Sequence, residues 1–195
     1  SNVNAQLLAQ GNVSIDSSAG LQNVSGTIES RNGDIAVSAA SLSNSRGNAA
    51  WVGAWQEIFQ GMDSGHDEED FFEVIKQVEI SPAGVINAAR DLSIVTGALS
   101  NQGALLNAGR DLSVDASGAV DNSARARSVK YVQSQVTSDG RVWDWAAGDN
   151  DKQFGTYATG VPENTASTIQ AGASLNVKSG GILVNSGNVL GQQIT

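Results

Sequence analysis

The chain has 195 residues, with 11 lysines and arginines against 20 aspartates and glutamates, so its formal net charge is −9. This acidic balance would repel nucleic acids and anionic membranes, and no apolar run approaches the roughly 18 residues that span a bilayer, so we expect neither nucleic-acid binding nor membrane insertion. With no cysteine and a single histidine, His66, the chain lacks the residues for disulfides, thiolate chemistry or a multi-histidine metal site.

Five repeats of about 21 residues organise the sequence: two before residue 47, two between residues 85 and 123, and one after residue 167. Aliphatic and small polar residues alternate in each repeat, as in V-S-I at 13–15 and L-S-V at 112–114, which is the period of a β-strand. Three short strands cannot close a sheet within 21 residues, but they can stack on the next repeat as parallel ladders about 4.8 Å apart. The pattern therefore predicts an all-β fold, a parallel β-solenoid with a narrow aliphatic core.

One asparagine recurs at the same position of every repeat. An asparagine at a corner tolerates a left-handed backbone, and stacked asparagines can pass amide hydrogen bonds from one copy to the next. We predict a structural ladder rather than a ligand site, formed by Asn23, Asn44, Asn101, Asn122 and Asn185.

Arginine–aspartate pairs recur at another corner, as Arg90-Asp91 and Arg110-Asp111. Because the two pairs lie one repeat apart, we expect a solvated corner with alternating charge.

The first insertion, roughly residues 47–84, differs from the repeats in composition. Trp51, Trp55, Ile58, Phe59 and Met62 have the spacing of one helix face, which predicts a helix. An acidic run follows at residues 67–70, and alternating apolar residues from 72 to 80 favour a strand.

The second insertion, roughly residues 124–167, predicts a β-hairpin and a loop. Residues 129–136 have strand character, Asp139-Gly140 is the usual centre of a two-residue hairpin turn, and residues 142–145 would form the return strand. Both insertions leave the repeats just after the asparagine position, so they would leave the solenoid at one edge, roughly 10 Å apart. We hypothesise that they pack on each other.

All ten aromatic residues of the chain lie in these two insertions. The residues that we single out for a satellite core or a binding surface are Trp51, Trp55, Phe59, Tyr131, Trp143, Trp145 and Tyr157. Packing is the favoured interpretation, because aromatic side chains bury much area per residue and an insertion needs its own core. The alternative is recognition of a surface, in which exposed Trp or Tyr side chains fill a partner pocket or stack on sugars.

Two acidic segments could suggest a metal site. The segment H-D-E-E-D at residues 66–70 consists of consecutive residues, which rarely converge on one ion, and Asp149-Asn150-Asp151 lacks the spacing of a complete calcium loop. We interpret them as a solvated loop and a turn, and we expect no metal, no other cofactor and no catalytic residues.

The repeated pattern G-x-D-L-x-V-x-A-x-x-L-x-N-x-G resembles the repeat of filamentous haemagglutinins. This family includes haemagglutinin-type adhesins and the stalks of contact-dependent growth inhibition toxins, which two-partner secretion systems export. The resemblance implies a right-handed parallel β-helix through residues 1–195, export through an outer-membrane transporter, and a secreted or bacterial cell-surface location with a role in adhesion and virulence. It brings no catalytic residues to this sequence.

The favoured function is a non-catalytic structural and adhesive stalk, whose insertions could contact a host or bacterial cell-surface receptor. One alternative is a polysaccharide-cleaving enzyme, because such enzymes also use parallel β-helices; Asp34, Asp91 and Asp111 share a corner column, but no acid/base pair is recognisable. Another alternative is a trimeric glycan-binding fibre. Five repeats without a capping element predict a segment of a longer solenoid.

Overall fold

The structure is a computed structural model that describes residues 1–47, 51–52, 57–62, 71–79, 81–127, 129–136 and 163–195. Within these residues every regular element is a β-strand. The chain divides into two compact units, which we describe separately. Unit 1 comprises Ser1–Asn48, Ser81–Ala126 and Asn164–Thr195, and unit 2 comprises Ala49–Ile80 and Arg127–Glu163.

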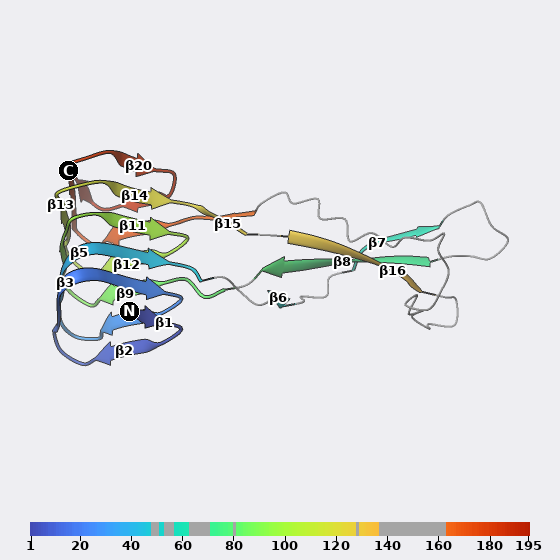
Figure 1. The fold of residues 1–195 in the computed structure, drawn as a ribbon, viewed down its shortest axis with the longest axis horizontal. Coiled ribbons are helices and arrows are strands. Elements are labelled where there is room, and N and C mark those ends of the chain that lie inside the picture. Colours follow the sequence, from blue (N-terminus) through green and yellow to red (C-terminus); the bar gives the residue numbers. More distant parts are fainter. Residues whose placement is uncertain (48–50, 53–56, 63–70, 80, 128, 137–162) are drawn as a thin grey trace. The chain divides into compact units, whose positions relative to one another are not determined.

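Unit 1 is a parallel β-solenoid whose rungs each contribute strands to three faces (Figure 1). Face A contains the first halves of β3 (Val13–Val24) and β5 (Ile35–Ser45), then β10 (Leu92–Thr96), β13 (Leu112–Ala116), β19 (Ser174–Ser179) and β22 (Gln193–Ile194). Face B contains β1 (Asn2–Val3), the second halves of β3 and β5, β11 (Leu99–Gln102), β14 (Val120–Ser123) and β20 (Leu183–Asn185). Face C contains β2 (Gln6–Ala9), β4 (Thr27–Ser30), β9 (Val85–Ala88), β12 (Leu105–Ala108), β18 (Thr168–Ala171) and β21 (Asn188–Leu190).

The register of these strands follows the sequence repeat. On face A, Val13 pairs with Ile35, Ile35 with Leu92, Leu92 with Leu112, and Leu112 with Leu175. A slip of one residue would turn every aliphatic side chain outward, so the alternation fixes the register. The predicted parallel β-solenoid is confirmed, and β1, β21 and β22 add partial rungs beyond the five repeats.

The core of unit 1 consists of aliphatic columns that run through the rungs. On face C, Ile28, Ile86, Leu106 and Ile169 stack in register and are at most 1% exposed. The buried apolar residues in the described part of the chain are all Ala, Val, Leu or Ile. Burying such side chains contributes roughly 25 cal/mol per Å² of apolar area removed from water, so each added rung stabilises its neighbours.

Tight corners connect the faces. At Gly109, an added Cβ would lie 2.2 Å from the carbonyl oxygen of Ala89 on the preceding rung. Only glycine allows the two backbones to approach this closely.

Unit 2 contains a four-stranded antiparallel sheet. Strand β8 (Phe71–Glu79) lies in the middle, with β16 (Val129–Val136) on one side and β6 (Trp51–Val52) and β7 (Glu57–Met62) on the other. Strands β15 (Arg125–Arg127) and β17 (Glu163–Thr165) form a separate two-stranded sheet.

The prediction of a helix over residues 51–62 is wrong. The described part of this stretch forms β6 and β7, and their backbones pair with β8. The register of β7 shifts between Glu57 and Gln60, and such an irregularity disturbs the two-residue alternation of a strand. The spacing of the apolar residues in this stretch therefore resembled that of a helix face. Strands β8 and β16 occupy the two other stretches with a strand pattern, whereas the hairpin turn at 138–141 and the return strand at 142–145 lie outside the described residues.

Candidate functional site

A ladder of side-chain amides runs through unit 1. The Nδ2 group of Asn23 donates to Oδ1 of Asn44, and the same bond joins Asn44 to Asn101, Asn101 to Asn122, and Asn122 to Asn185, each at 2.8 Å. The first four of these asparagines are at most 1% exposed. The ladder has a sixth member that was not predicted, Asn2, which donates to Asn23 at 2.8 Å and lies 21 residues before it, at the spacing of the repeat.

The same amides also join two faces of the solenoid. Their Nδ2 groups, which belong to face B, donate to face C carbonyl oxygens, for example from Asn44 to Leu105 at 3.0 Å and from Asn101 to Thr168 at 3.2 Å. Each interior amide therefore has its donors and its acceptor satisfied. A buried amide left without partners would cost about 1–3 kcal/mol, so the ladder holds the corner closed at every rung.

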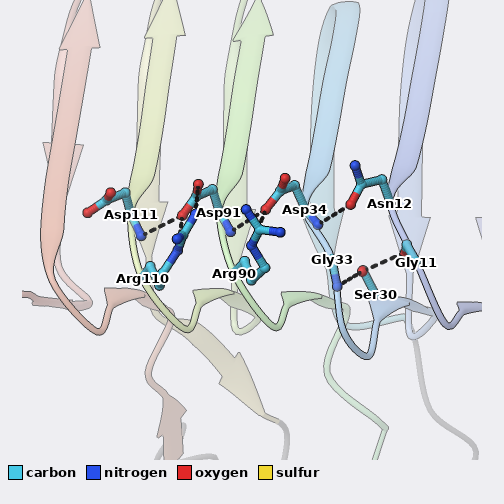
Figure 2. A network of polar contacts seen from close by, with 9 residues as sticks. All are labelled: Gly11, Asn12, Ser30, Gly33, Asp34, Arg90, Asp91, Arg110 and Asp111. Atoms are coloured by element: carbon cyan, nitrogen blue, oxygen red, sulfur yellow. Dashed lines mark hydrogen bonds and ion pairs between the residues drawn. The ribbon is translucent and has the colours of Figure 1, made fainter.

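A second column lies at the corner before face A (Figure 2). The Oδ1 atom of one rung accepts from the backbone N–H of the next: Asn12 from Asp34 at 2.9 Å, Asp34 from Asp91 at 3.2 Å, and Asp91 from Asp111 at 3.3 Å. Asp111 continues the column by accepting from Ser174 at 3.0 Å. The side chains of this column thus replace strand-to-strand hydrogen bonds at a corner.

Two arginines pair with two of the three aspartates in this column (Figure 2). Arg110 makes a two-pronged contact with Asp91, with Nε–Oδ1 at 3.0 Å and Nη2–Oδ2 at 2.5 Å, and Arg90 Nε lies 3.4 Å from Asp34 Oδ1. The hydrogen bond from Arg110 holds the pKa of Asp91 below its ordinary value. The structure thus places the predicted arginine–aspartate pairs in a half-exposed corner with alternating charge.

This geometry does not favour polysaccharide cleavage at the column. Two catalytic carboxylates must face a shared substrate space as acid and base or nucleophile, whereas Asp34 and Asp91 are each occupied by a backbone amide and an arginine. Within the described residues, no group of three His, Cys, Asp or Glu side chains is placed to hold a metal ion.

The solenoid surface also has a shallow depression of about 330 Å³, lined by Ser38, Val95, Gly97, Asp115 and Ser117 among others. Its carboxylate, Asp115, lies 3.1 Å from Lys178 Nζ. An open depression with one ion-paired carboxylate lacks the convergent polar groups of a built ligand site.

The two insertions meet in unit 2. Strand β8 belongs to the first insertion and β16 to the second, and eight consecutive residue pairs join them, from Val129 with Val78 to Val136 with Phe71. Of the seven singled-out aromatic residues, Trp51 lies in β6 opposite Glu79, Phe59 lies in β7, and Tyr131 lies in β16 opposite Lys76. Trp55, Trp143, Trp145 and Tyr157 lie outside the described residues. A satellite core of aromatic side chains therefore stays a prediction.

Buried serine hydroxyls close the roots of both insertions, that is, the places where each insertion leaves and rejoins the rungs of unit 1. Ser25, with a left-handed φ of 49°, accepts from the N–H of Gly47 and donates to the carbonyl of Pro82, both at 2.8 Å. Gly47 and Pro82 lie near the two ends of the first insertion. Ser167, at the end of the second insertion, accepts from the N–H of Gly103 at 2.6 Å and contacts the carbonyl of Ser123, which precedes that insertion. Both roots are thus closed within unit 1.

Charge is divided unequally between the units. Unit 2 holds 13 of the 20 acidic residues, 5 of the 11 basic residues and all ten aromatic residues, so it carries −8 of the net charge of −9. Unit 1 is nearly neutral, aliphatic and regular.

Stacked parallel rungs, an interior amide ladder and aliphatic columns define a β-solenoid repeat protein. The haemagglutinin repeat family matches residues 1–52, 75–124 and 145–195. These segments cover well over half of the chain, and the protein belongs to this family. Searches of curated proteins and of solved structures find no significant match. None of the described residues forms a helix long and apolar enough to cross a membrane.

The interior ladder predicts a large effect of Asn101→Ala. Asn44 Nδ2 and Asn122 Oδ1 would lose their partner in the core, so we expect the free energy of unfolding to fall by roughly 2–4 kcal/mol. Asn107→Ala is the matched control, because Asn107 bonds to Asn87 of the preceding rung on the outer, half-buried side of face C; we expect a loss below about 1 kcal/mol. Urea unfolding followed by circular dichroism measures both, and equal losses would contradict a stabilising interior ladder.

The carboxylate column predicts a pH-dependent effect of Asp91→Asn. Asparagine keeps the Oδ1 acceptor for Asp111 but removes the charge that faces Arg110. Because the folded-state pKa of Asp91 is lowered, its stabilisation is present at neutral pH and is lost as the pH falls through that pKa. The difference in Tm between wild type and variant should thus be small at pH 7, since the pair is half exposed, and should vanish in strong acid. A difference that grows on acidification would contradict this assignment.

Proposed function

We propose that the chain is a non-catalytic stalk segment of a secreted, filamentous adhesin-like exoprotein. Membership of the haemagglutinin repeat family supports this proposal, as does the unbroken sequence of amide hydrogen bonds from Asn2 to Asn185. Parallel rungs joined along their whole length form a stiff rod, in which each rung contacts only its neighbours. The role is mechanical, because the rod holds other parts of the exoprotein away from the cell.

The proposal includes an export route and a location. Family membership supports secretion through the outer-membrane transporter of a two-partner system, followed by display on the bacterial cell surface or release. Contact-dependent growth inhibition is one setting in which such stalks occur. Strands that stack rung by rung suit this route, because each rung that emerges can add to the preceding one.

Unit 2 is the part that we assign to receptor contact on a host or bacterial cell. Its aromatic residues and its charge of −8 separate it from a solenoid whose rungs repeat one pattern. Tyrosine and tryptophan are enriched among residues that dominate binding energy. The serine-closed roots support a division in which unit 1 supplies the scaffold and unit 2 the specificity.

Removal of unit 2 tests this division of roles. Residues 49–80 and 127–163 would each be replaced by a short Gly/Ser linker, and binding of labelled protein to epithelial cells and to a panel of bacteria would be measured. We expect saturable binding by the wild type and at least a tenfold loss in the variant, about 1.4 kcal/mol, with the β signal of unit 1 retained. Val95→Ser, on the exposed outer face of the solenoid, is the control that should bind like wild type. Full binding without unit 2 would contradict the assignment.

A further inference from the structure

Face A is the side of the solenoid from which no insertion leaves. The first insertion departs after β5 on face B and returns before β9 on face C, and the second departs after β14 on face B and returns before β18 on face C. Both roots therefore lie at the corner between faces B and C. The outward side chains of face A are exposed on all five repeats, and neighbouring rungs of a longer solenoid would not cover them.

Two outward columns form the surface of face A. One column consists of short side chains, which are Ser14, Ala36, Ser93, Ser113 and Asn176. Short side chains in register make a flat strip, which a second flat surface can approach closely. The other column has charges toward its ends and an apolar residue at its centre, in the order Asp16, Ser38, Val95, Asp115 and Lys178.

The centre of the second column is an exposed apolar side chain. Val95 is 55% exposed, and among the described residues between Leu8 and Ile182 it is the one exposed large apolar residue. The shallow depression of about 330 Å³ adjoins it, with Ser38 on one neighbouring rung and Asp115 on the other. A second valine side chain has room there, and its contact with Val95 would remove apolar area from water.

The charges of this column are complementary to the same column turned end for end. A two-fold axis parallel to the strands, between two copies of Val95, places Asp16 of each copy opposite Lys178 of the other. It also places the hydroxyl of Ser38, a donor, opposite the carboxylate of Asp115, an acceptor. Lys178 pairs with Asp115 of its own chain at 3.1 Å, but its side chain is 72% exposed and can contact a second carboxylate. Two solenoids that point the same way would instead place each charge opposite its like.

We propose that two copies of this chain associate side by side and antiparallel through face A. The contact is isologous, because each copy contributes the same residues, and it closes after two copies. The surface is about 20 Å long and two columns wide, smaller than the roughly 800 Å² per partner of a standard interface. We therefore expect a weak dimer, with a Kd on the order of 0.1 mM. This association does not depend on the adhesive role of unit 2.

Reversal of the charges at the two ends of the column tests the arrangement. Sedimentation equilibrium from about 10 µM to about 1 mM, in about 0.15 M salt, would show the wild-type mass rising from one chain toward two. Asp16→Lys places a lysine opposite Lys178 twice in each dimer, so we expect a Kd at least about tenfold weaker. In the double variant Asp16→Lys/Lys178→Glu, each introduced lysine faces an introduced glutamate, so association should return.

Glu29→Lys is the matched control, because it changes the net charge as Asp16→Lys does but lies on face C; it should associate at least as well as the wild type. Val95→Glu places two carboxylates at the centre of the contact, and we expect a Kd at least about tenfold weaker. Circular dichroism should be unchanged in every variant, since the substituted residues point outward.

A wild type that remains monomeric at 1 mM would overturn the proposal. Equal association of Asp16→Lys and Glu29→Lys would do the same. A double variant that associates no better than Asp16→Lys would also overturn it, because that result would indicate contact between solenoids that point the same way, or contact through the ends of the stack.

Discussion

A side-chain amide can lie inside an aliphatic core only when both its donors and its acceptor find partners, and that requirement governs unit 1. The ladder meets it by stacking one asparagine per rung, so each Asn44 or Asn101 depends on the rungs on either side. The neighbouring aliphatic columns need the same register. A shift that satisfied the apolar residues but not the amides would leave buried polar groups unpaired, so the two demands reinforce each other.

The solenoid was predictable from the sequence because its physics is periodic. The same position in every repeat contacts the same kind of neighbour, so the columns containing Leu112 and Asn122 can be predicted from the sequence alone. The insertions have no such redundancy. The irregular pairing of β7 with β8 cannot be inferred from the spacing of Ile58 and Phe59, and the predicted helix fails there. The serine roots also escaped prediction, since the partners of Ser25 and Ser167 are brought together only by the stacked rungs.

The two units differ in sequence character: unit 1 repeats one pattern, whereas unit 2 holds the residues that the repeat does not contain. In the described part of unit 1 no charged residue is fully buried, and at the corner before face A Arg110 pairs with Asp91. Unit 2 concentrates acidic and aromatic residues in segments that the solenoid does not need for its register. Closing each root inside unit 1 allows the insertions to vary in sequence without disturbing the stack. This division is the physical basis for the stalk and the recognition element that we propose.

The most direct test of this account is hydrogen exchange at the asparagine side chains, measured by NMR with ¹⁵N labelling. The Nδ2 protons of Asn23, Asn44, Asn101 and Asn122 should exchange only through opening of the solenoid, far more slowly than those of Asn107 on the outer face. All four should also lose protection together on approach to the unfolding transition. Exchange of the interior amides at the rate of Asn107 would show that the ladder does not hold the rungs, and would contradict the account.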